Sequence, residues 1–104
     1  MDVMKIVRDH GVIPVLGLKN PDTAEALAAA LIQGGLPLIE VTLRSEGALE
    51  CLRRIKKAYP EMAVGAGTVL TTEQADKAMA AGAKFIVTPG FNPEVVGHCV
   101  EKGY

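Results

Sequence analysis

The sequence has little net charge of either sign. Its 11 Lys and Arg residues nearly balance its 12 Asp and Glu residues, which leaves a net charge of −1. The basic residues are scattered among acidic ones, so the chain has neither the basic stripe that binds nucleic acid nor an acidic tail. Charge therefore gives no reason to expect a nucleic-acid partner.

Long apolar runs are also missing. No run approaches the roughly 20 apolar residues that are needed to span a bilayer. The first five residues do not have the layout of a signal peptide. We therefore expect a soluble, cytoplasmic chain without a membrane partner.

Cysteine and histidine occur only twice each. Cys51 and Cys99 both fall in expected helices, are not spaced like a zinc or redox motif, and are too few for a disulfide framework, so we expect reduced thiols. His10 and His98 are expected to be exposed helix residues, and neither has a second ligand at metal spacing. The sequence thus predicts no metal site and no cofactor.

What the sequence does contain is a repeated unit of one strand followed by one helix. A short helix is expected at 2–10, strands at 12–18, 38–44, 62–69 and 84–88, and helices at about 21–33, 45–58, 72–81 and 93–102. Asn20 before Pro21 and Asn92 before Pro93 are typical helix openings, and Ser45 is a candidate cap for the helix at 45–58. Pro14 should lie near a strand start, because proline cannot donate to a sheet ladder.

Residues 1–104 are enough for one small domain. Strands that alternate with helices predict an α/β domain with a parallel sheet and right-handed crossovers. Length favours an open, doubly wound sheet, because a (β/α)8 barrel normally needs about 200 residues or more.

The strand at 38–44 favours the barrel instead. Alternation places Glu40, Thr42 and Arg44 on one face and Ile39, Val41 and Leu43 on the other. An open sheet covered by helices on both sides would bury that polar face, whereas the mouth of a barrel accepts it. Taken alone, a glutamate and an arginine on one face of a strand are more typical of a structural ion pair than of a functional site.

Three segments together resemble a known family. The segments 39–44 (IEVTLR), 64–70 (VGAGTVL) and 87–90 (VTPG) are similar, in order and spacing, to the 2-keto-3-deoxy-6-phosphogluconate and 4-hydroxy-2-oxoglutarate aldolases. This resemblance covers nearly the whole chain. It implies a (β/α)8 barrel with a short leading helix, of which residues 1–104 would be the N-terminal half, a single domain of four βα units.

The resemblance also implies a chemistry and a set of site residues. Members of this family are class I aldolases of Entner–Doudoroff metabolism, which form a Schiff base between a lysine and pyruvate. Glu40 matches the general acid/base, Arg44 the residue that holds the substrate carboxylate, Thr68 a hydrogen-bond donor to the same end of pyruvate, and Pro89 a residue that lines the pocket around the methyl group. The substrate would be a small keto acid.

The family's Schiff-base lysine lies on the sixth strand, so it is not in this chain, and the family's phosphate-binding loops are absent as well. Lys19 follows the first strand but should be solvated, and Lys84 should lie at the non-catalytic end. The relatives are commonly trimers, so a homo-oligomer is expected, although a half chain could pair with itself.

Two other functions stay open. The first is a non-catalytic half-barrel that self-associates through its sheet edges. The second, an open-sheet receiver-like or flavodoxin-like binding domain, has less support because no phosphate loop or acidic cluster is present. Gly65 and Gly67 do not complete a dinucleotide fingerprint, since Leu70 stands where the third glycine should be.

Overall fold

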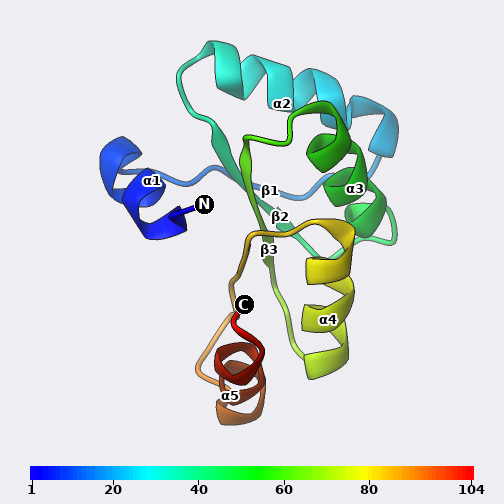
Figure 1. Cartoon of the computed structure of the whole chain (residues 1–104). Coiled ribbons are helices and arrows are strands. Elements are labelled where there is room, and N and C mark those ends of the chain that lie inside the picture. The colour runs from blue at the N-terminus through cyan, green and yellow to red at the C-terminus, as the bar shows by residue number, and fades with distance from the viewer.

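The computed structural model describes all 104 residues, and its helices and strands alternate along the chain (Figure 1). All four strands pair in parallel, in the order β1-β2-β3-β4. The predicted α/β fold, a parallel βα repeat with a leading helix, is confirmed. The elements are α1 (Val3–His10), β1 (Val15–Leu16), the 3-10 turn η1 (Pro21–Thr23), α2 (Ala24–Gln33), β2 (Leu38–Thr42), α3 (Ala48–Ala58), β3 (Ala63–Gly67), α4 (Thr72–Ala81), β4 (Phe85–Ile86) and α5 (Pro93–Lys102).

The two outer strands are shorter than predicted. β2 and β3 have five residues each, whereas β1 and β4 have two. Each outer strand pairs with a neighbour on one side only, so hydrogen bonds to that one neighbour alone decide its length. Pro14 lies just before β1, as expected, and its carbonyl accepts a hydrogen bond of 2.8 Å from the Glu40 backbone N–H.

The main core lies between the sheet and helices α2, α3 and α4, which gather on one side of the strands in Figure 1. Every second residue of β2 and β3 points into it and is almost fully buried. Small side chains on the helices let them pack closely against the sheet. The buried residues at this interface include Ile39, Val41, Val64 and Ala66 from the strands and Ala24, Ala28, Leu52, Ile55, Ala75 and Ala78 from the helices.

Two of the three predicted caps are confirmed. The side chains of Asn20 and Asn92 accept hydrogen bonds from backbone N–H groups in the turns that follow them. Ser45 is not a cap, because α3 begins at Ala48. The Ser45 hydroxyl instead donates to the Leu18 carbonyl oxygen at 2.8 Å, which joins the loops that follow β1 and β2.

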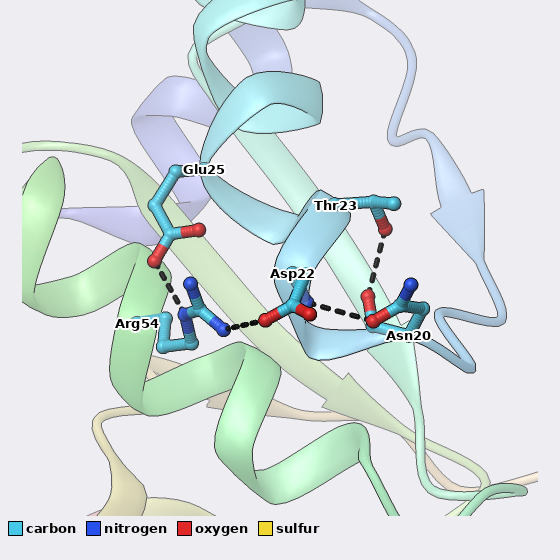
Figure 2. A network of polar contacts seen from close by, with 5 residues as sticks. All are labelled: Asn20, Asp22, Thr23, Glu25 and Arg54. Carbon is cyan, nitrogen blue, oxygen red and sulfur yellow. Dashed lines mark hydrogen bonds and ion pairs between the residues drawn. The ribbon is translucent and has the colours of Figure 1, made fainter.

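A polar network on the outer face joins the start of α2 to α3 (Figure 2). Arg54 donates from Nε to Glu25 at 2.6 Å and from Nη1 to Asp22 at 2.8 Å. Asn20 accepts from the Asp22 backbone N–H through its side chain and from the Thr23 hydroxyl through its carbonyl. The hydrogen bond from Arg54 lowers the pKa of the Glu25 carboxyl. This network orients two helices but lies away from the polar face of β2.

The prediction that both histidines are exposed is wrong. His10 is half-buried, and its Nδ1 lies 2.8 Å from the Ile6 carbonyl oxygen. His98 is also half-buried, because its Nε2 contacts the Asp76 carboxylate at 2.7 Å, and the Tyr104 hydroxyl donates to the same oxygen. These contacts, led by that of His98, lower the pKa of Asp76. They connect α4 to α5 and to the last residue.

Both cysteines lie in helices and carry free thiols. None of the helices combines the length and the apolar character that crossing a bilayer requires. No group of three His, Cys, Asp or Glu side chains is arranged to hold a metal ion.

The Asn92 cap gives a test of the local structure. Its side-chain oxygen accepts from the backbone N–H groups of Glu94 at 3.1 Å and Val95 at 3.3 Å. We expect Asn92→Ala to lower the free energy of unfolding by about 1 kcal/mol, because these donors lose their partner. Asn92→Asp keeps the acceptor and should stay near the wild-type value. Urea unfolding of the three proteins measures the difference, and equal stability of the alanine variant would contradict the role of this cap.

Candidate active site

The side chains on the inner face of β2, opposite the helices, are Leu38, Glu40 and Thr42. The neighbouring strand β3 offers almost no side chain there. Gly65 pairs with Glu40 in the parallel register, and Gly67 pairs with Thr42. The space over these two glycines is filled by other side chains, over Gly65 by the Phe85 ring and over Gly67 by the Glu40 carboxylate.

The Glu40 carboxylate lies over Gly67. A Cβ atom at position 67 would overlap the carboxylate, so only glycine allows this conformation without a shift of the glutamate. Glu40 is 8% exposed, and its carboxylate has no hydrogen-bond or ion-pair partner in the structure. Burial raises the pKa of this carboxyl. A carboxyl with a raised pKa is suited to give and take protons closer to neutral pH.

Arg44 lies outside the strand in which it was predicted, because β2 ends at Thr42 and Arg44 belongs to the turn that follows. Its side chain is exposed, and Nε donates to the Thr68 hydroxyl at 3.4 Å, which is long for a hydrogen bond. Arg44 forms no ion pair with Glu40, so the structural ion pair that the strand pattern alone favoured is not formed. The guanidinium remains free to bind a carboxylate.

Thr68 has an unusual backbone conformation. Its φ is +55°, in the left-handed region that β-branched residues rarely adopt. Hydrogen bonds on both sides of the turn hold it, from the Leu43 N–H to the Gly67 carbonyl at 2.8 Å and from the Val69 N–H to the Val87 carbonyl at 3.2 Å. Backbone strain of this kind is concentrated at functional sites, where it fixes the direction of a side chain.

Pro89 lies at the same end of the sheet as Thr68 but farther from Glu40, since β4 is two strands away from β2. It is exposed in the loop after β4, where the Thr88 hydroxyl donates to the Gly90 carbonyl at 2.7 Å. The structure therefore brings Arg44 and Thr68 together, with Glu40 lying over Gly67, the residue before Thr68, and leaves Pro89 at the edge of the group.

The two lysines considered as nucleophiles are placed as the sequence predicted. Lys19 is exposed in the loop after β1, and Lys84 directly precedes β4, at the opposite end of the sheet from the loops that carry Thr68 and Pro89. Neither forms an ion pair with the Glu40 carboxylate.

The site residues form an open wall, not an enclosed pocket. The four cavities of the structure, the largest of about 600 Å³, are lined by other residues, and none includes Glu40, Arg44, Thr68 or Pro89. A small ligand bound here would be covered on one side only.

Sequence reasoning missed two features of this wall. It did not foresee that Gly67 makes room for the Glu40 carboxylate, although two glycines beside a charged strand are a usable signal of close approach. It placed Thr42 on the polar face but gave it no role, whereas the structure leaves the Thr42 hydroxyl buried without a partner.

Comparison with known proteins places this chain in a family. The family model described as KDPG and KHG aldolase matches residues 3–104. The 2-dehydro-3-deoxy-phosphogluconate aldolase of Treponema pallidum is 51% identical over 92 residues, which are 88% of this chain and 44% of that protein.

Solved structures agree with the sequence match. The 2-keto-3-deoxy-6-phosphogluconate aldolase of Zymomonas mobilis, crystallised with 3-phosphoglycerate, has a TM-score of 0.90 and 40% identity over 98% of this chain and 48% of its own. The KDPG aldolase of Legionella pneumophila, with pyruvate captured as a covalent carbinolamine intermediate, has a TM-score of 0.82 and 38% identity, covering 86% and 43%.

The chain spans about half the length of the curated relatives it matches. Its four βα units correspond to about half of the solved aldolase chains. Since the family model covers nearly every residue, the chain belongs to the KDPG and KHG aldolase family.

Proposed function

We propose that this chain forms the pyruvate-binding and proton-transferring wall of a class I aldolase. The enzyme would cleave 2-keto-3-deoxy-6-phosphogluconate, 4-hydroxy-2-oxoglutarate, or both, into pyruvate and an aldehyde. The observation that carries the proposal is the largely buried Glu40 carboxyl, which forms no hydrogen bond or ion pair within the protein and lies over Gly67, the residue before the Thr68 that contacts Arg44.

Glu40 is proposed as the general acid/base. Cleavage of the C3–C4 bond requires a proton to leave the C4 hydroxyl, and the enamine that results must gain a proton at C3. Burial favours the neutral form of Glu40, so its proton affinity is higher than that of a surface glutamate. A single carboxyl can then accept the proton from the C4 hydroxyl and donate a proton to C3 of the enamine.

Arg44 and Thr68 are proposed to hold the carboxylate of the pyruvate unit. The guanidinium offers a planar pair of donors, and the Thr68 hydroxyl lies 3.4 Å from its Nε, so both can donate to the same anion. Pro89, exposed in the loop after β4, is proposed to line the pocket around the methyl group. Its place at the edge of the wall fits the apolar end of pyruvate.

The Schiff-base lysine is proposed to come from the part of the relatives that this chain does not match. The covalent carbinolamine in the Legionella pneumophila aldolase is the adduct expected when an amine adds to the keto carbon of pyruvate. In this proposal the second half also supplies the opposite wall of the pocket.

Trapping with borohydride tests whether the Schiff-base lysine lies outside residues 1–104. Residues 1–104 alone and the same residues joined to the C-terminal half of the Treponema pallidum relative would each be incubated with pyruvate and sodium borohydride. We expect mass spectrometry to find a reduced pyruvate adduct on the joined protein only, and to place it outside residues 1–104. An adduct on a lysine of the isolated chain would contradict the proposal, as would a folded joined protein that gains no adduct.

Glu40→Gln separates the catalytic role from the structural one. In the joined protein we expect turnover to fall by about 10² to 10⁴-fold, because the amide cannot exchange protons. Glu46→Gln removes an exposed carboxyl from the turn after β2 and should leave turnover unchanged. Wild-type turnover in Glu40→Gln would refute the general acid/base role.

The same variant should change the pH dependence of stability. Because burial raises the pKa of Glu40, the folded chain keeps this proton to a higher pH than the unfolded chain. Below the pKa of Glu40 in the unfolded chain, about 4.3, the neutral carboxyl makes its full contribution to the free energy of unfolding. This contribution is lost as the pH rises through the pKa of Glu40 in the folded chain. Glu40→Gln stays neutral, so urea unfolding should show it gaining stability relative to wild type as the pH rises from 4 to 7.

A non-catalytic, self-associating half-barrel is the second candidate. β1 and β4 each pair on one side only, and Val15, which shares the inner-face row with Glu40, is 56% exposed. A second copy could pair its β4 with β1 and its β1 with β4, which would close both edges by twofold symmetry. Sedimentation equilibrium of residues 1–104 tests this: a dimer that Val15→Lys dissociates supports it, and a monomer at every concentration excludes it.

A further inference from the structure

The row of inner-face residues that contains Glu40 crosses all four strands. In the parallel register, Glu40 pairs with Val15 on β1 and with Gly65 on β3. Gly65 pairs in turn with Phe85 on β4. Val15 and Phe85 therefore provide the only other side chains of this row, and neither of them is charged.

The Phe85 ring is folded across the neighbouring strand. A Cβ atom at position 65 would overlap the ring, so Gly65 allows the ring to lie there without a shift. Phe85 is half-buried and is not part of the main core, whereas the next residue, Ile86, packs against that core. The ring therefore acts on the inner face of the sheet and not on the packing of the helices.

The two glycines of β3 offer two positions to neighbouring side chains, and both positions are filled. The Phe85 ring lies over Gly65, and the Glu40 carboxylate lies over Gly67, one row closer to the carboxyl end of the strands. The direct register partner of Glu40 is Gly65, so without the ring the glutamate could also turn toward Gly65. Because the ring fills that space, the carboxylate is left with the direction that leads to the turn of Thr68.

We infer that Phe85 is a positioning residue, whose ring directs the Glu40 carboxylate toward Gly67 and shields it from water. The inference rests on the proposed function, in which Glu40 transfers protons beside the site for the substrate carboxylate. Burial alone raises the pKa of Glu40, and no neighbouring charge contributes. Arg44, in the turn after β2, forms no ion pair with it.

A cavity beside Phe85 shows what the ring keeps away from Glu40. Phe85 lines an apolar cavity of about 350 Å³ that also borders α1 and α5, and the rim of this cavity is exposed at Met4 and Val100. Because Phe85 covers Gly65 and borders the cavity, a methyl group in place of the ring would extend the cavity to the row of Glu40. Water could then reach the carboxyl from that side.

Titration of Glu40 in residues 1–104 tests this role without needing activity. In Phe85→Ala, carbon-13 NMR of the side-chain carboxyl should show the Glu40 midpoint falling from the wild-type value toward the ordinary value of about 4.3, because water stabilises the charged form. The NOE between the Glu40 Cγ protons and the Gly67 Cα protons should weaken, because the side chain is free to turn toward Gly65. Phe85→Leu keeps a large apolar side chain and should show smaller changes in the same direction, and it replaces the alanine variant if that variant does not fold.

Ile86→Ala is the matched control. Ile86 follows Phe85 on β4 but packs on the opposite face of the sheet, so its truncation should lower Tm and leave the Glu40 midpoint and the NOE at their wild-type values. An unchanged midpoint and NOE in folded Phe85→Ala would overturn the inference. Equal changes in Ile86→Ala would overturn it as well, because they would show a general loosening of the sheet.

Kinetics of the joined protein give an independent readout. We expect Phe85→Ala to lower kcat by about tenfold or more with KM nearly unchanged, and to move the acidic limb of the pH–rate profile to lower pH. Phe85→Leu should recover part of both, and Ile86→Ala should keep the wild-type limb. Wild-type kcat and an unmoved limb in Phe85→Ala would contradict the positioning role. If the wild-type joined protein traps no pyruvate, the proposed function fails, while the NMR titration still decides whether Phe85 positions Glu40.

Discussion

The arrangement of this site depends on a carboxyl that is buried next to a glycine. Glu40 could not adopt its position if residue 67 carried a side chain, and its carboxyl would not be buried if it pointed toward solvent from the end of the strand. The parallel register fixes both conditions at once, because it places Gly65 and Gly67 opposite Glu40 and Thr42. The fold thus buries the Glu40 carboxyl, and this burial raises its pKa.

The two faces of β2 serve different purposes. Ile39 and Val41 are buried against the helices and hold the sheet in place, as the core of any parallel α/β domain does. On the other face, the Thr42 hydroxyl oxygen is buried without a partner, and the largely buried Glu40 carboxyl forms no hydrogen bond or ion pair within the protein. Both features reduce stability. A strand that gives up stability on one face while it is firmly packed on the other is typical of a functional site on a rigid scaffold.

Much of this could be predicted from the sequence, because strong local signals determine it. Proline, glycine and cap residues mark the helix ends, and apolar alternation identifies β2 and its two faces. The position of Glu40 followed from that alternation, and the segments around Thr68 and Pro89 placed the chain in its family. These signals depend only on neighbouring residues and on a periodic pattern.

The remaining features depend on contacts between distant segments. Arg44 lies beyond the strand and Ser45 does not cap α3, because their turn is held by hydrogen bonds to Gly67, at the end of β3, and to Leu18, in the loop after β1. His98 is half-buried because Asp76, on another helix, lies beside it. The buried hydroxyl of Thr42 became visible only once the neighbouring strands were in register.

The protonation of Glu40 in the isolated chain is the most direct test of this account. Carbon-13 NMR of its side-chain carboxyl over a pH series gives the midpoint without any substrate or second half. The account predicts a midpoint clearly above the ordinary glutamate value of about 4.3. A midpoint at or below that value would show that the carboxyl is solvated or paired, and would contradict the central claim.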